Sequence, residues 1–85
     1  MIDRPIASIR KNAREEIRVA LRDFKGRRGI DLRIHQLSPR QDDGIMMEPT
    51  PKGLVVRPDQ LRAVIKGLQQ AEAAAREEGL IDPAE

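Results

Sequence analysis

The sequence predicts an α+β domain, a four-stranded antiparallel β-sheet followed by one long C-terminal amphipathic helix. Apolar and polar residues alternate with a period of two in Glu16–Phe24 and again in Ile30–Leu37, as is typical of half-buried strands. From Pro58 to Glu78, apolar residues recur at spacings of three and four, which indicates a helix with one apolar face. The chain has 85 residues, a single Phe and no Cys. Because its core must be thin and no disulfide can brace it, we expect a homodimer.

The two ends of the chain are expected to lie outside the folded domain. Residues 1–14 (MIDRPIASIRKNAR) mix a proline and several basic residues with a few aliphatic ones. They are expected to form a basic N-terminal arm with at most a short strand. Residues 15–80 form the domain in this interpretation, and residues 81–85 form a short tail.

Turn-forming residues set the expected limits of the strands. Lys25–Gly29 (KGRRG) holds two glycines and is expected to join the first two strands as a hairpin connection. Ser38–Gly44 (SPRQDDG) has the composition of a loop. A third strand is expected over Ile45–Thr50 and a fourth over Leu54–Arg57, with a tight turn at residues 51–53 between them.

The helix has recognisable signals at both ends. Pro58 suits the first turn of a helix, and Asp59 suits the positive end of the helix dipole. Gly79 followed by Leu80 is typical of a C-terminal cap. The apolar side of the helix needs an apolar partner, and the apolar faces of the strands are expected to supply one.

Charge is distributed unevenly along the chain. The net charge is only +2. Residues 1–40, however, hold eleven Lys and Arg against five Asp and Glu, whereas residues 41–85 hold five against nine. A basic half favours contact with polyanions. No apolar run approaches the roughly 20 residues that span a bilayer, and the first residues lack a signal-peptide core, so a soluble intracellular protein is expected.

One face of the predicted sheet is strongly basic. This face and the adjoining turn carry Arg18, Arg22, Phe24, Lys25, Arg27, Arg28, Arg33 and His35. Arginines contact phosphates, and aromatic rings stack on unpaired bases. A shallow basic sheet therefore fits single-stranded nucleic acid better than a major groove, which admits a helix or a ribbon. The alternative is a basic face that serves only solubility and edge protection, with Phe24 in the core.

Catalytic and metal-binding functions are not expected. The only histidine, His35, has no serine or carboxylate at a spacing typical of a triad. Asp42 and Asp43 are adjacent in a loop and are expected to be a solvated turn and not a cation site. Gly26 and Gly29 flank two arginines and do not open a helix, as a phosphate-binding loop would. The protein is therefore expected to be no enzyme and to use no metal or cofactor.

Three segments together resemble the transcriptional coactivator family of positive cofactor four, and most closely its bacterial branch. They are REEIRVALRDFKG (residues 14–26), IDLR (residues 30–33) and PTPKGLVV (residues 49–56). Their order and spacing match those of the family from about Asn12 to Leu80.

The resemblance implies a homodimer that binds single-stranded DNA, or melted duplex, with little sequence preference. It places the strand aromatic of the family on Phe24 and its basic positions on Lys25, Arg27, Arg33 and Lys52. It also implies a role in transcription and a location in the cytoplasm, in association with the bacterial nucleoid. Together with the basic face, the predicted nucleic-acid-binding residues are Arg18, Arg22, Phe24, Lys25, Arg27, Arg33, His35 and Lys52.

Several positions depart from the family pattern. A tryptophan expected just beyond Arg33 is absent, since the sequence there is His35 and Gln36. Glu48 and Pro51 stand where the family has basic residues. These changes remove stacking and positive charge, so weaker binding is expected. They also support an alternative function, a dimeric protein–protein interaction module that has lost strong nucleic-acid binding.

Overall fold

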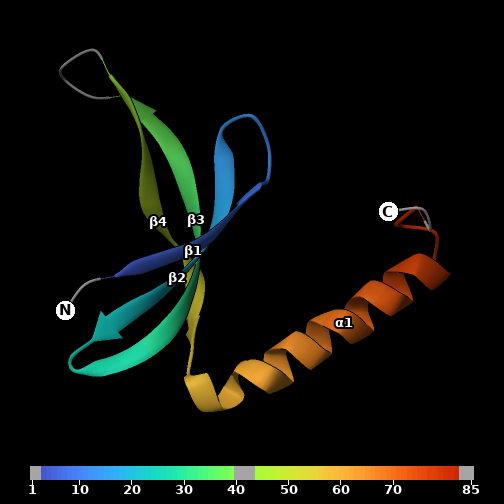
Figure 1. The fold of residues 1–85 in the computed structure, drawn as a ribbon. Coiled ribbons are helices and arrows are strands. Elements are labelled where there is room, and N and C mark those ends of the chain that lie inside the picture. Colours follow the sequence, from blue (N-terminus) through green and yellow to red (C-terminus); the bar gives the residue numbers. More distant parts are fainter. Residues whose placement is uncertain (1–2, 40–43, 83–85) are drawn as a thin grey trace.

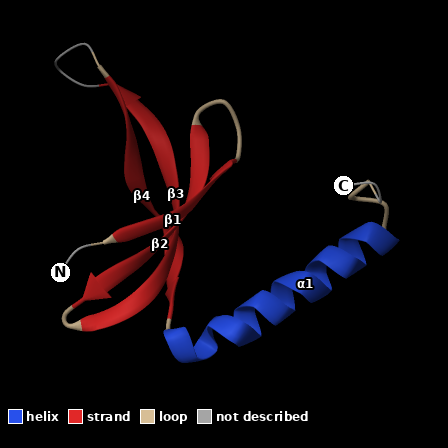
Figure 2. Cartoon of the chain, viewed as in Figure 1, coloured by secondary structure: helices blue, strands red, loops and turns tan. Residues whose placement is uncertain are grey.

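The structure, a computed structural model, describes residues 3–39 and 44–82. In chain order the elements are β1 (Arg4–Arg10), β2 (Glu15–Phe24), β3 (Arg27–Pro39), β4 (Ile45–Val56), a 3₁₀ turn η1 (Pro58–Gln60) and α1 (Leu61–Glu77). The strands form one antiparallel sheet in the order β1-β2-β3-β4, and the helix follows it (Figures 1 and 2). The predicted fold class is confirmed.

Strands β2 and β3 pair as their alternation predicts. Val19 lies opposite Leu32, and the neighbouring apolar residues are paired in the same way. Phe24 pairs with Arg27, so the connection is only Lys25 and Gly26 and not the whole of Lys25–Gly29. Both residues have a positive φ, 54° and 84°, as a type I′ turn requires. This tight turn allows Arg27 to begin β3.

The four strands are not the four that the sequence predicts. Arg4–Arg10, expected in an arm with at most a short strand, forms the seven-residue strand β1 at one edge of the sheet. The expected third and fourth strands are one continuous strand, β4, which includes the expected turn at residues 51–53. The register shifts between Arg33 and His35, so the extra residues of β4 are absorbed as a bulge. Prolines are tolerated there because β4 is an edge strand.

The C-terminal end of α1 has the predicted cap. Gly79 has a φ of 76°. The amide of Leu80 donates to the carbonyl of Ala75 at 2.8 Å, and the amide of Gly79 donates to that of Arg76 at 3.2 Å. These two bonds are those of a Schellman motif. The expected loop at Ser38–Gly44 lies mostly outside the described residues, and its first two residues belong to β3.

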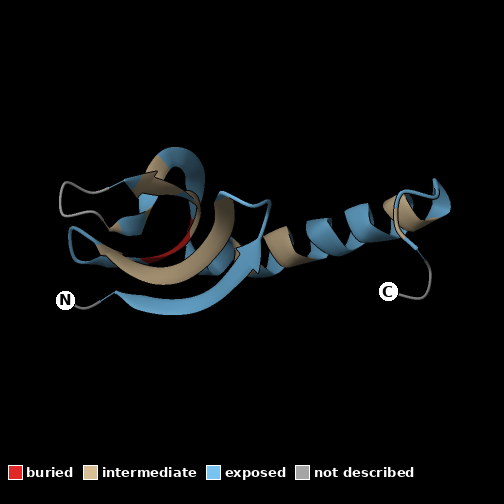
Figure 3. Ribbon diagram, turned by 90° about the horizontal axis from the view of Figure 1, so that it is seen from above, coloured by how far each residue is buried: buried red, intermediate tan, exposed pale blue. Residues whose placement is uncertain are grey.

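The helix does not cover the sheet of its own chain. It extends away from the end of β4 and leaves the apolar side of the strands open (Figure 1). Among the described hydrophobic residues, only Ile30 and Val56 are buried, at 7% and 3% exposure, and most of α1 is exposed (Figure 3). The predicted contact between helix and strands is therefore absent within the described part of one chain.

No helix within residues 3–39 and 44–82 combines the length and the apolar character needed to cross a membrane.

Candidate nucleic-acid interface

Strand register places the predicted arginines on one side of the sheet. Arg18 of β2 lies opposite Arg33 of β3, and Arg22 lies opposite Gly29. His35 follows Arg33 on the same side of β3 because it is two residues further along the strand. We call the side that carries Arg18, Arg22, Arg33 and His35 the cationic face. Like charges directly opposite each other destabilise a sheet, so acidic partners are needed between them.

Asp31 is the main acidic partner on this face. It lies opposite Ala20, the residue midway between Arg18 and Arg22 on β2. Only 4% of its side chain is exposed. Arg22 Nη1 donates to its Oδ2 at 3.3 Å, and Arg33 Nη2 donates to its Oδ1 at 3.0 Å. Arg33 Nε lies 3.2 Å from both carboxylate oxygens. One buried carboxylate therefore holds guanidinium groups from two neighbouring strands.

Arg33 is bonded within the sheet through all three of its nitrogens. Besides its contacts with Asp31, Nη1 donates to the carbonyl oxygen of Thr50 at 2.8 Å. Thr50 Oγ1 donates to the carbonyl of Ile34 at 2.8 Å and accepts the amide of Lys52 at 3.2 Å. Arg33 is 19% exposed. It therefore links β3 to the bulge of β4 next to Lys52 and presents little of itself to a ligand.

Arg22 is more accessible and lies over the only aromatic ring. Its Cζ is 5.6 Å from the centroid of the Phe24 ring, within the range of a cation–π contact. Its Nε donates to Asp3 Oδ2 at 3.2 Å. Phe24 is 37% exposed, so it lies at the surface beside an arginine and outside the core. This position fits the predicted stacking role.

The remaining predicted site residues differ in their hydrogen bonds and ion pairs. Arg18 Nε donates to Glu16 Oε2 at 2.9 Å. Lys25, Arg27 and Lys52 are exposed, and no side-chain hydrogen bond or ion pair joins them to another described residue. His35 lies between Glu16 and Pro49 in the register, and its buried Nδ1 has no hydrogen-bond partner among the described residues.

Glu15, near this surface, has a pKa below its ordinary value. The main cause is hydrogen bonding from Asn12, whose Nδ2 lies 2.8 Å from Oε1, followed by hydrogen bonding from Lys11. The positive charge of Lys52 also lowers this pKa. Glu15 therefore stays ionised and offsets part of the positive charge at the Lys52 end of the surface.

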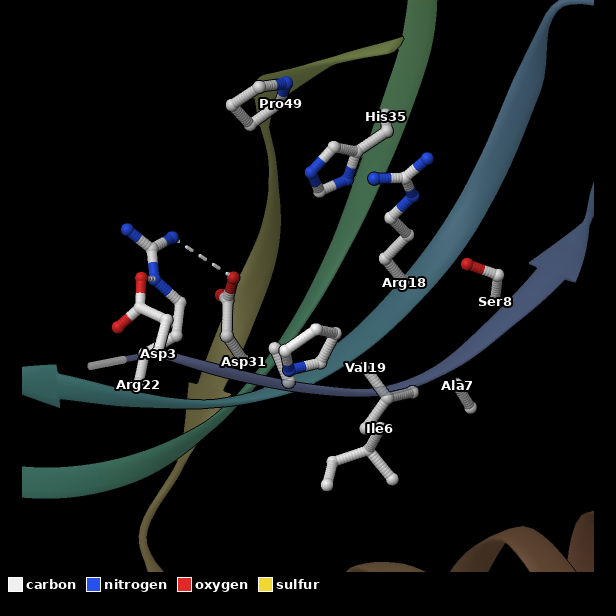
Figure 4. A pocket seen from close by; sticks show the side chains of 12 residues that line it. Asp3, Ile6, Ala7, Ser8, Arg18, Val19, Arg22, Asp31, His35 and Pro49 are labelled. Carbon is white, nitrogen blue, oxygen red and sulfur yellow. Dashed lines mark hydrogen bonds and ion pairs between the residues drawn. The ribbon is translucent and has the colours of Figure 1, made fainter.

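A shallow pocket of about 470 Å³ opens on the cationic face. In Figure 4, Asp3, Arg22 and Asp31 lie on one side of it, while Arg18 and His35 lie on the other. Pro49 of β4 and residues of β1, among them Ser8, complete the wall. Both guanidinium groups and apolar residues, among them Ala7 and Val19, therefore line the hollow.

Two partners of the arginines could not be recognised from the sequence. Asp3 reaches Arg22 only because residues 4–10 join the sheet as β1, and that segment has no clear alternation. Thr50 contacts Arg33 only because β4 bulges at this point. Asp31 did have a signal, since it alternates in phase with Arg33 two residues away.

Comparison with known proteins identifies a solved relative in two crystal forms. A PC4 homolog from Burkholderia pseudomallei K96243, in a tetragonal form, is 35% identical and superposes with a TM-score of 0.70, covering 84% of this chain and 98% of that chain. The orthorhombic form gives 35% identity and a TM-score of 0.68, covering 81% and 88%. No protein-family model and no curated protein matches the chain. With this identity over nearly the whole relative, the chain belongs to the bacterial branch of the PC4 (positive cofactor four) family.

Proposed function

We propose that this protein is a dimeric, sequence-tolerant single-stranded nucleic-acid-binding protein that acts as a transcription cofactor or in other DNA transactions. The observation that carries the proposal is the cationic face, with an exposed aromatic ring at its end, in a PC4 fold. A role in transcription and contact with the transcription machinery follow from family membership and belong to the same proposal, as does association with the nucleoid.

The shape and charge of the surface favour a single strand. Phosphates would contact the exposed cations, and a base would stack on Phe24, which a paired base in a duplex does not readily do. The arginines lie on a shallow sheet surface, whereas sequence recognition in a duplex needs an element that enters the major groove. The contacts involve charge and ring faces, so little sequence preference is expected.

The cations are not equally available to phosphates. Lys25, Arg27 and Lys52 are free of ion pairs with described residues, and Arg18 uses only Nε in its contact with Glu16. Arg33 is bonded internally, and Arg22 is shared with Asp3 and Asp31. We therefore assign the direct phosphate contacts to Arg18, Lys25, Arg27 and Lys52. Arg22 acts beside Phe24.

A second copy of the chain is proposed to cover the open apolar surfaces. One chain exposes 7048 Å², whereas a compact protein of 9.6 kDa exposes about 5,100 Å². Its radius of gyration is 15.7 Å, against about 12 Å for a compact 85-residue domain. The area that this chain exposes beyond that of a compact protein is of the size that each chain of an obligate dimer buries. The open side of the sheet and the apolar stripe of α1, in which Leu68 is 59% exposed, would supply the interface. This stripe consists of Leu61, Val64, Ile65, Leu68, Ala71 and Ala75.

The test is fluorescence anisotropy of a labelled oligo-dT titrated with the protein over a salt series. Four phosphate contacts predict a slope of log K against log salt of about −2.8 for a single strand. Replacing Lys25 and Arg27 by alanine should reduce the steepness by about 1.4. The matched control replaces Arg62 and Lys66, two exposed cations of α1, and should leave the slope unchanged. An excess of unlabelled duplex should compete poorly.

A protein-interaction module is the second candidate function. It is favoured by the internal bonding of Arg33 and by Glu48 and Pro51 on β4, both of which are exposed. Absence of oligonucleotide binding at low salt would reject the nucleic-acid function and leave this one.

A further inference from the structure

We propose that Asp31 is a positioning residue of the nucleic-acid interface, a buried carboxylate that fixes Arg22 on one side and the Lys52 segment of β4 on the other. This inference rests on the proposed single-strand binding. An acidic residue in a surface for polyanions opposes binding if only its charge acts. The geometry points to a different role for this one.

On the β2 side, Asp31 fixes the guanidinium of Arg22. Oδ2 accepts Nη1 at 3.3 Å, while Cζ of the same group lies over the Phe24 ring, 5.6 Å from its centroid. Nε is 3.2 Å from Asp3, and Nη2 has no bonding partner among the described residues. Asp31 thus holds Arg22 against the ring, beside the position proposed for a stacked base.

On the β4 side, Asp31 acts through Arg33. The guanidinium bonds Asp31 through Nε and Nη2 and bonds the Thr50 carbonyl through Nη1. Thr50 Oγ1 in turn accepts the amide of Lys52. Hydrogen bonds joined through Arg33 and Thr50 therefore link the buried carboxylate to the backbone of a proposed phosphate contact, across the register shift of β4.

Burial explains why the negative charge does not repel the ligand. The side chain of Asp31 is 4% exposed and is bonded to the side chains of Arg22 and Arg33, which are 37% and 19% exposed. Its charge is largely offset by these two partners before a phosphate approaches. Charge-assisted bonds of this kind are short and directional. They order the two arginine side chains before the nucleic acid binds, so less conformational entropy is lost on binding.

The test compares Asp31→Asn with Glu16→Gln by oligo-dT anisotropy over a salt series. Both changes remove one negative charge from the same side of the sheet. The Glu16 side chain, however, is 28% exposed, and among the described residues its only hydrogen bond and ion pair is with Arg18. Glu16→Gln should tighten binding, because it frees Arg18 and removes repulsion. Asp31→Asn should weaken binding about tenfold, the loss of one charge-assisted contact, and should reduce the steepness of the salt slope by about 0.7, the share of the Lys52 contact.

A second variant guards against misfolding of Asp31→Asn, because removing one member of a buried ion pair is destabilising. Arg33→Lys keeps the charge but loses the planar fork that joins Asp31 to Thr50. It should weaken binding, and the effect should not add to that of Lys52→Ala, because the two act through one contact. Circular dichroism at the assay temperature confirms that each variant is folded.

The outcomes separate this inference from the proposed function. If the unsubstituted protein does not bind oligo-dT, the proposed function is rejected and the inference with it. If it binds, and folded Asp31→Asn binds as tightly as Glu16→Gln, Asp31 acts only through its charge and the inference alone is rejected. Additive effects of Arg33→Lys and Lys52→Ala would also reject it.

Discussion

Lys25 is the only non-glycine residue of the described chain with a positive φ, 54°. This conformation costs an ordinary L-residue about 1–2 kcal/mol, and asparagine adopts it more readily. Lysine therefore occupies a position that the turn would fill better with another residue. Lys25 is exposed and directly follows Phe24 in the chain. A contribution of Lys25 to nucleic-acid binding would explain why a lysine is found at this position although it lowers the stability of the fold.

Lys25→Asn should therefore stabilise the fold and weaken binding in one step. We expect up to about 1 kcal/mol of added stability and a rise in Tm of about 4–8 °C for each kcal/mol, measured by thermal unfolding. Lys25→Ala is the control, because it removes the same charge and keeps the strained turn. It should lose the same oligonucleotide affinity without the gain in Tm. Equal Tm values for the two variants would contradict the argument.

At the scale of the elements, the pairing of β3 with β4 depends on Gly53. A Cβ at this position would lie against the carbonyl oxygen of Leu32 and 2.9 Å from the Cα of Arg33. Backbone atoms cannot move away as a flexible side chain can. Residue 53 must therefore be glycine for β4 to resume its register beyond the bulge.

Gly53→Ala should destabilise the protein by about 1–3 kcal/mol, the usual cost of overpacking, seen as a lower urea midpoint. Gly67→Ala is the opposite case. A Cβ there meets nothing within 4 Å, and alanine is favoured over glycine inside a helix by about 0.8–1.0 kcal/mol. An unchanged midpoint for Gly53→Ala would mean that the two strands can separate locally without loss.

Some elements can be predicted from their residues better than others. Strands β2 and β3 follow from alternation, and α1 and its Schellman cap follow from spacing and Gly79. The sequence predicts at most a short strand where β1 lies, because Pro5 and two flanking charges obscure any period. Strand β4 was divided in two because Pro49, Pro51 and Gly53 are also turn formers, and only the contacts of Thr50 with β3 show that they form a bulge.

The grouping of arginines on one side of the sheet was predictable from the sequence, but their hydrogen-bond partners were not. Arg18 and Arg22 share an alternation phase with Phe24, and antiparallel pairing of the next strand brings Arg33 to the same side. Which guanidinium meets which carboxylate depends on register across three strands. For this reason Arg33 and Lys25 look alike in the sequence, although one is bonded within the sheet and the other is exposed.

At the scale of the whole molecule, the proposed dimer depends on the apolar stripe of α1. Leu68→Lys should shift the protein towards monomer, because burying a leucine is worth about 1.5–3 kcal/mol per chain and a symmetric interface counts it twice. Light scattering at micromolar concentration should give about 19 kDa for the unsubstituted protein, twice its chain mass of 9.6 kDa. Gln70→Lys adds the same charge opposite the stripe and should leave the mass at 19 kDa. A mass of 9.6 kDa without substitution would refute the dimer.

The separation of α1 from its own sheet has a consequence for how the protein responds to dilution. A helix of 17 residues is marginal in water by itself and needs packing to persist. If that packing comes from a second chain, helix formation is a second-order process. The far-ultraviolet signal of the helix should then fade as the protein is diluted below the dissociation constant of the dimer. Dilution alone would then unfold part of this protein, and α1 would be the first element to unfold.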